Sequence, residues 1–272
     1  MGAPIIDDEL WALIGPLLPP PKPRRKKYPG RLSVPNRAAL NGILFVFKTG
    51  IRWRDLSTKL RFGSGPTCWR RLRDWQRAGV WSALHELLLA KLRKAGELDF
   101  SRAAVDSSSV RAVGNGRKTG PNPTDRSRPG SKHHILVDAN GVPISAILTG
   151  ANRNDVTQLL PLIDAVPPLR GVRGPPLRKP KVIYADRGYD SEPHRQRLRA
   201  RGIEPVIARR RTEHGSGLGK VRCVVERTHA WRHNFRRLRI RFKRRADIHE
   251  AFLKLGCALV CWNSFRRTEQ SF

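Results

Sequence analysis

The chain has 272 residues, of which 39% are hydrophobic, so it can bury a core and is not a disordered tail. Lysine and arginine number 54 against 22 acidic residues, and the net charge is +32. A charge of this sign and size indicates a nucleic-acid partner; a ribosomal-type RNA binder and a membrane-surface protein are the alternatives. The membrane alternative is disfavoured because the basic residues run through the whole chain rather than along one amphipathic helix.

The sequence shows no membrane or secretion signal. Acids stand near the N-terminus where a signal peptide would carry basic residues, and no run of eighteen apolar residues occurs. The four cysteines (Cys68, Cys223, Cys257 and Cys261) make neither a convincing disulfide framework nor a zinc motif. We therefore expect a reduced, cytoplasmic protein associated with the nucleoid.

Residues 1–98 are predicted to form a small helical module. Apolar residues recur there at helical spacing, with glycine or proline between the stretches. The expected helices are residues 7–18, 36–48, 53–60, 64–81 and 82–94. A Pro-rich basic linker, residues 19–30, follows the first helix and is expected to track phosphate.

The helix expected at residues 64–81 carries arginines on its outer face. The glycine-containing turn RFGSGP precedes it, an order that resembles a helix-turn-helix module. Its expected DNA contacts are Arg70, Arg71 and Arg73. The alternative is an ordinary helical bundle with a solvated basic face.

From residue 99 to residue 272 the pattern predicts a second domain of strands and helices. The expected strands are residues 99–113, a hairpin at 133–150 with its turn at 138–141, 181–186 and 203–208. The expected helices are residues 155–166, 192–201, a long helix from 220 to 235, and 248–265. This order predicts an α/β layered fold around a mixed sheet.

Two aspartates lie in or directly after expected strands, at positions where an acidic residue is unusual. Asp186 directly follows the apolar run VIYA, and ligands of open α/β sheets bind beyond the carboxyl ends of the strands. Asp106 lies inside the first expected strand, where an acid needs a local reason. Taken alone, Asp186 also fits a simple turn before Gly188, and Asp106 is ambiguous.

Glu226 is the most informative acid of the chain. It is the one acid between Arg222 and Arg245, among ten basic residues, and it follows an apolar stretch of its expected helix. The alternative is a counter-ion for Arg222, but a lone surface ion pair contributes only about 0–1 kcal/mol.

Two aspartates on strands and a glutamate on a helix suit metal-dependent phosphodiester chemistry. Two Mg²⁺ ions about 3.5–4 Å apart can activate a nucleophile and relieve charge on the attacked phosphorus. Carboxylate oxygens are the ligands such ions prefer. We therefore expect two Mg²⁺ ions, with Mn²⁺ as a substitute.

Six segments, spread over nearly the whole chain, carry a familiar pattern. They are ALNGILFVFKTGIRWRDL, AVDSSSVRA, KTGPNPTDRSRPGSKHHILVD, GANRNDVTQLLPL, YADRGYDS and VVERTHAWRHNFRRLRIR. In this order they resemble the DDE transposases of bacterial insertion sequences, in particular the family of insertion sequence five. The resemblance implies an RNase H-like core with Asp106, Asp186 and Glu226 as its catalytic, metal-binding residues.

The resemblance also covers residues around the glutamate. Family members carry an arginine one turn before it, matched here by Arg222. The broader group often has a tyrosine seven residues before the glutamate and a lysine seven after it, where this chain has Gly219 and His233. The residues expected to contact DNA here are Arg222, Arg227, His233, Arg236 and Arg237.

Other polar residues near expected strand ends have simpler explanations. Asp138 fits the hairpin turn, and Asp155 and Asp190 each fit the start of a helix. His133 and His134 are expected on a strand beside the site rather than as a catalytic base.

The sequence thus predicts a transposase. It is expected to bind the terminal inverted repeats of its element as double-stranded DNA, cleave the ends and join the 3′ hydroxyls to target DNA. Synapsis of two ends implies a homodimer. A nuclease of the same fold without strand transfer and a non-catalytic DNA-binding repressor are the rival hypotheses.

Overall fold

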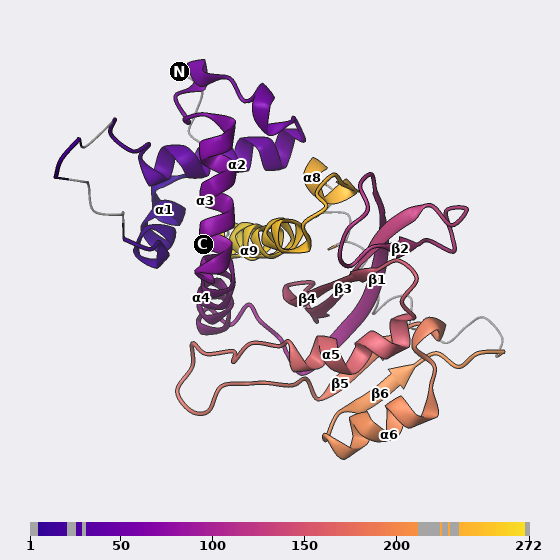
Figure 1. The fold of residues 1–272 in the computed structure, drawn as a ribbon. Coiled ribbons are helices and arrows are strands. Elements are labelled where there is room, and N and C mark those ends of the chain that lie inside the picture. Colours follow the sequence, from indigo (N-terminus) through magenta and orange to yellow (C-terminus); the bar gives the residue numbers. More distant parts are fainter. Residues whose placement is uncertain are drawn as a thin grey trace.

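The structure, a computed structural model, describes residues 5–20, 26–28, 31–211, 224, 228 and 234–269, without the side chains of 268 and 269. In it, an N-terminal group of helices stands beside a mixed sheet that carries further helices (Figure 1). The α/β layered fold predicted from the sequence is confirmed. No helix within the described part of the chain is long and apolar enough to cross a membrane.

The N-terminal helices follow the apolar spacing of the sequence. Their bounds are α1 (Asp8–Ile14), the 3₁₀ turn η1 (Gly15–Leu17), α2 (Asn36–Thr49), α3 (Gly65–Arg77) and α4 (Val80–Lys94). Gly50 ends α2 in the left-handed conformation, at φ 75°, and its N–H donates to the Val46 carbonyl. Leu72 and Trp75 of α3 are buried, as the sequence predicts.

Two predictions for this module were wrong. Residues 53–60 form no α-helix but two 3₁₀ turns, η2 (Trp53–Asp55) and η3 (Thr58–Leu60), because the chain between them is extended. The break between the last two helices lies at Gly79 rather than after Trp81. Gly79 has φ 76°, a left-handed conformation that ends α3 and that other residues rarely adopt.

The sheet places three antiparallel strands beside two parallel ones. Its central path runs β4–β3–β1–β5–β6; β1, β3 and β4 are antiparallel neighbours, and β5 and β6 run parallel to β1. The short strands β2 and β7, not predicted from the sequence, pair with β3 and with the end of β1. The strands are β1 (Arg102–Ala112), β2 (Gly120–Pro121), β3 (Pro129–Asp138), β4 (Pro143–Gly150), β5 (Val182–Ala185), β6 (Glu204–Ile207) and β7 (Ile240–Arg241).

The predicted hairpin turn at residues 138–141 is confirmed, and Asp138 holds it. The carboxylate of Asp138 is buried and accepts hydrogen bonds from the backbone N–H groups of Asp99, Asn140 and Val142. Burial raises the pKa of Asp138 to about 7, against the three donors that lower it. Asp138 is therefore a turn-forming residue.

Helices follow the strands as the sequence predicts. The predicted helix 155–166 begins as a 3₁₀ turn and ends earlier, and helix 192–201 is confirmed. The elements are η4 (Asp155–Gln158), α5 (Leu159–Asp164), η5 (Arg187–Tyr189), α6 (Glu192–Ala200), α8 (Arg236–Arg239) and α9 (Ala246–Glu269). The predicted helix 220–235 lies almost wholly outside the described residues.

The C-terminal helix α9 joins the two parts of the molecule. It contacts α3 and α4 on one side and β4 on the other, and Figure 1 shows it between the N-terminal helices and the sheet. Leu88 of α4, Phe252 of α9 and Ile144 of β4 belong to one buried apolar cluster. The two predicted domains therefore share a hydrophobic core in this structure, and the boundary at residue 98 stays a prediction.

Candidate active site

Asp106 and Asp186 come from neighbouring parallel strands. The pairing of β1 with β5 aligns Ala104 with Tyr184, and continuing this register by two residues sets Asp106 beside Asp186. Adjacent strands lie about 4.8 Å apart, so the two aspartates are neighbours at the carboxyl end of β5. Both are half-buried. The structure thus brings together two residues that stand eighty positions apart in the sequence.

The chain after β5 is shaped by Asp186 itself. Its Oδ1 accepts a hydrogen bond from the Gly188 N–H at 2.8 Å and caps the 3₁₀ turn η5. This turn buries Tyr189, and burial raises the pKa of its hydroxyl well above the usual value. Three nearby carboxylates raise it further; they are Asp155, Asp106 and Asp186. One buried tyrosine is therefore close to three acids.

Asp155 is the third acid near the carboxyl end of β5. Its Oδ1 accepts a hydrogen bond from Ser107 Oγ at 2.7 Å and lies 3.0 Å from Lys132 Nζ. A β-carbon added to Gly188 would lie 2.9 Å from Asp186 Oδ1 and 3.9 Å from Asp155 Oδ2, so both carboxylates lie close to Gly188. The helix-start position predicted for Asp155 is confirmed, since η4 begins there. Its closeness to the two aspartates was not foreseen.

His134 borders the same cluster as a neutral group. Its Nδ1 lies 3.7 Å from Asp155 Oδ1, and its Nε2 shares a hydrogen bond of 2.8 Å with Thr149. Burial lowers the pKa of His134 to about 4, so the ring carries no charge near neutral pH. The prediction that His134 lies on a strand beside the site is confirmed. His133, also on β3, shares a buried contact of 2.8 Å with His249 of α9.

Several predicted site residues lie outside the described residues. They are Glu226, Arg222, Arg227 and His233, together with Gly219. Among the residues that the structure does describe, no three His, Cys, Asp or Glu side chains are grouped closely enough to hold a metal ion. The described part of the site therefore supplies carboxylates from two strands and a turn, and all three metal ligands stay a prediction.

Comparisons with known proteins identify the family. A family model described as "Transposase DDE domain" matches residues 98–261, and "Putative transposase of IS4/5 family" matches residues 6–85. The chain belongs to the DDE transposases. It is accordingly an enzyme of that class, as the sequence predicted, and Asp106 and Asp186 lie within the matched domain.

Two relatives from Burkholderia cepacia are highly similar to this transposase. The protein named "Putative transposase for insertion sequence element IS402" is 79% identical over 154 residues, which is 57% of this chain and 73% of the relative. The "Insertion element IS402 uncharacterized 16.2 kDa protein" is 75% identical over 123 residues, which is 45% of this chain and 84% of the relative. The transposase thus has close relatives encoded by an insertion element.

A solved structure confirms the RNase H-like fold. The piggyBac transposase, in a synaptic complex with hairpin DNA, matches with a TM-score of 0.53 and 11% identity. The match covers 96% of this chain and 71% of that one. At this identity the likeness concerns the fold alone.

The arginines predicted to contact DNA differ in the solvent exposure of their side chains. Arg70 and Arg236 are exposed, whereas Arg71 and Arg73 are half-buried and Arg73 pairs with Asp74 at 2.7 Å. Arg237 is buried, and its guanidinium donates a hydrogen bond to the Ile51 carbonyl. The sequence does not indicate which arginine of such a basic stretch is buried, because the arginines are identical and closely spaced.

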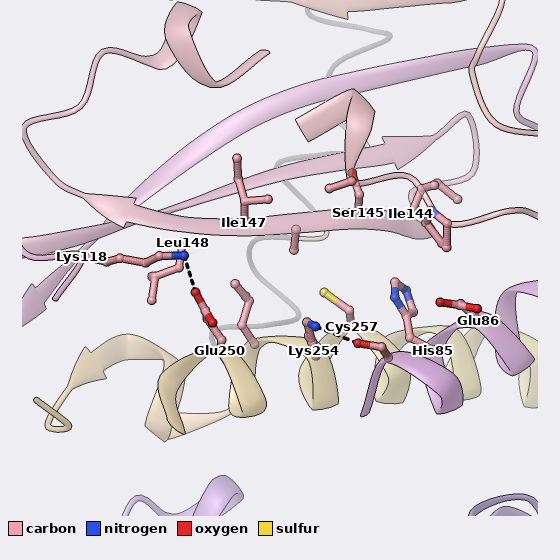
Figure 2. Close-up of a pocket in the computed structure, with 15 residues that line it drawn as sticks. His85, Glu86, Lys118, Ile144, Ser145, Ile147, Leu148, Glu250, Lys254 and Cys257 are labelled. Atoms are coloured by element: carbon pink, nitrogen blue, oxygen red, sulfur yellow. Dashed lines mark hydrogen bonds and ion pairs between the residues drawn. The ribbon is translucent and has the colours of Figure 1, made fainter. Parts of the chain in front are cut away.

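A cavity elsewhere in the transposase is unrelated to the aspartates. It has a volume of about 300 Å³ and lies between β4, α4 and α9 (Figure 2). Two lysines on its wall have partners, Lys118 with Glu250 at 2.5 Å and Lys254 with the hydroxyl of Ser82 at 2.7 Å. Neither Asp106 nor Asp186 lines this cavity. The candidate active site therefore lies at the carboxyl end of β5 rather than in this cavity.

Proposed function

We propose that this transposase binds the terminal inverted repeats of its own insertion sequence, cleaves at each end and joins the freed 3′ hydroxyls to target DNA. The observation that carries the proposal is the placement of Asp106 beside Asp186 at the carboxyl end of β5. An acidic pair in a chain of net charge +32 suits a phosphodiester substrate, because the surrounding cations attract the DNA backbone.

The donor set fits divalent metal ions. Asp106 and Asp186 offer carboxylate oxygens from adjacent strands, and Glu226 is proposed as the third ligand from its place in the sequence. Two Mg²⁺ ions, or Mn²⁺ in their place, would activate the attacking hydroxyl and neutralise charge on the phosphate. The sheet holds the two aspartates in fixed positions, so little reorganisation is needed when the phosphate arrives.

Asp155 and Lys132 are suited to a supporting role. Lys132 Nζ contacts both Asp155 and the Arg153 carbonyl at 3.0 Å, which fixes a cation next to the acidic pair. Asp155 also orients Ser107, which directly follows Asp106. Through these contacts Asp155 would position the strand that carries Asp106.

DNA contact is proposed for both ends of the chain. Residues 1–98 would read the element ends through Arg70, Arg71 and Arg73, and the proposed catalytic domain, residues 99–272, would hold phosphates through Arg222, Arg227, His233 and Arg236. Arg237, buried on the Ile51 carbonyl, would act by holding this segment in place. The turn and helix order before α3 supports the first contact. We further propose a homodimer in the synaptic complex and a cytoplasmic, nucleoid-associated location.

Strand transfer is tested with DNA from the flanks of the protein's own gene. The protein is incubated with Mg²⁺, a pre-cleaved end carrying a 3′ hydroxyl, and a supercoiled target plasmid. Covalently joined products are expected, and they require both Mg²⁺ and Asp106. Cleavage of uncut ends without any joined product would support a nuclease of the same fold. Identical behaviour of wild type and Asp106→Ala in every assay would support a non-catalytic repressor.

A further inference from the structure

Residues 236–245, here called the basic segment, hold seven basic residues and no acid. The basic segment is docked on the N-terminal helices rather than extending freely from the sheet. The ring of Phe235, which precedes it, stacks on Phe47 of α2 with centroids 4.4 Å apart. Arg237 donates to the Ile51 carbonyl, just beyond α2. Figure 1 shows α8 beside one end of α2.

The basic segment also reaches α3, the helix with the predicted DNA contacts. The ring of Trp69 on α3 lies near two guanidinium groups, 5.4 Å from that of Arg73 and 5.8 Å from that of Arg245. Lys243 Nζ lies 5.8 Å from the ring of Trp53. Cations of α3 and of the basic segment therefore belong to one surface.

A buried arginine fixes the shape of the basic segment. Arg241 is 0% exposed, and its guanidinium makes five hydrogen bonds of 2.7 to 3.0 Å. The acceptors are the carbonyls of Arg117, Lys118, Lys243 and Arg244 and the hydroxyl of Ser131. Because neighbouring residues of an extended chain point to opposite sides, the inward Arg241 turns the next residue outward.

That next residue is Phe242, which is 46% exposed. Its ring lies 5.4 Å from the guanidinium of the buried Arg237. Arg239 and Arg244, two and three positions from Arg241 in the sequence, are exposed as Phe242 is. An aromatic ring held on a cation and set among cations is the arrangement on which nucleic-acid bases stack.

The position of Phe242 relative to the aspartates follows from the sheet. Ala112 of β1 pairs with Arg241, and Ala112 is six residues beyond Asp106 on the same strand. At about 3.3 Å per residue this separation is roughly 20 Å. It corresponds to roughly six base pairs at about 3.4 Å each.

We propose that Phe242 stacks on a base of the bound DNA about six base pairs from the phosphate held at Asp106 and Asp186, and that it locally unstacks the duplex there. This inference rests on the proposed function, because it requires DNA to lie across the two aspartates. The partner is double-stranded DNA rather than a protein, since the basic segment that carries the ring holds seven basic residues and no acid.

The test measures base unstacking without relying on catalysis. Duplexes of the element end each carry 2-aminopurine at a single position, and the full-length protein is added without metal. With wild type, fluorescence is expected to rise at one or two adjacent positions, because the probe brightens when it leaves the base stack. Phe242→Ala should abolish this rise and weaken binding roughly fivefold or more, whereas Phe242→Tyr should keep both.

A matched control and a cleavage map complete the experiment. Val172 is 52% exposed on another surface loop, so Val172→Ala should leave fluorescence and affinity unchanged. Cleavage of the same duplex with Mg²⁺ then locates the scissile phosphate relative to the bright position. An equal fluorescence rise in wild type and Phe242→Ala, or no rise at any position, would overturn the proposal. Failure of cleavage alone would count against the proposed function and leave the stacking result standing.

Discussion

Around Asp106 and Asp186 a few charged side chains lie on paired strands, whereas the basic segment holds seven cations within ten residues. In the first region each carboxylate has its own neighbours, such as the Gly188 N–H that contacts Asp186. In the second, the cations share one effect, the attraction of phosphate. A single substitution should therefore have a large effect on activity in the aspartate region and a small effect on DNA binding in the basic segment.

The largest effect is expected from the two aspartates. Asp106→Asn and Asp186→Asn keep the shape of the side chain but remove the charge that would hold the metal. Each should lower the rate of end cleavage about 10³-fold, since a bound metal contributes several kcal/mol to transition-state stabilisation. DNA affinity, measured by filter binding without metal, should change less than twofold. A variant that kept a tenth of the cleavage rate would remove that aspartate from the proposed metal site.

The next prediction distinguishes two acids as the third ligand. Glu226→Gln should match the aspartate variants, whereas Asp155→Asn should lower the rate only about 10- to 100-fold, as residues supporting a metal ligand do. Both variants are compared in single-turnover cleavage at increasing Mn²⁺. Excess Mn²⁺ should partly rescue Asp155→Asn alone. The opposite ranking would assign the ligand role to Asp155 and place Glu226 outside the site.

The sequence was informative where a local pattern carries the signal. Asp186 after an apolar run and Asp106 inside a strand pattern could both be recognised without knowing which strands pair. Asp155 could not, because its own surroundings indicate only a helix start. Its role becomes visible when sheet pairing and the chain that follows β4 bring Ser107 and Lys132 to its carboxylate. The burial of Arg237 and Arg241 could not be predicted for the same reason, since long-range contacts decide which arginines are buried.

One residue of the basic segment, the buried Arg241, should have a large effect on stability when it is substituted. Arg241→Lys keeps the charge but supplies three donors where the arginine uses five, so carbonyls of the turns around it lose partners. Unfolding free energy should fall by about 2 kcal/mol, or a Tm decrease of roughly 4–8 °C. Differential scanning fluorimetry measures the change. The exposed Arg239→Lys is the matched control and should shift Tm by less than about 1 °C, since surface substitutions have small effects.

The smallest expected effect is proton uptake by Lys243 of the basic segment when DNA binds. Burial lowers the pKa of Lys243 to about 8, and the nearby Arg237 adds to this. The folded chain therefore loses this proton before the unfolded chain does, and Lys243 makes the fold relatively more stable as pH rises from about 8 toward 10.5. A DNA phosphate near the ammonium would raise its pKa again, so binding at pH 8.5 should take up part of one proton.

Proton uptake is measured from the dependence of the calorimetric binding enthalpy on the ionisation enthalpy of the buffer. Lys243→Gln should remove the uptake at pH 8.5 and weaken binding only a few-fold, because the remaining cations still attract the backbone. At pH 6.5 wild type should take up no proton at this residue, since Lys243 is already charged. Equal uptake in wild type and Lys243→Gln at pH 8.5 would mean that no phosphate approaches this lysine. Any DNA contact of the basic segment would then fall to other cations, such as the exposed Arg236 and Arg239.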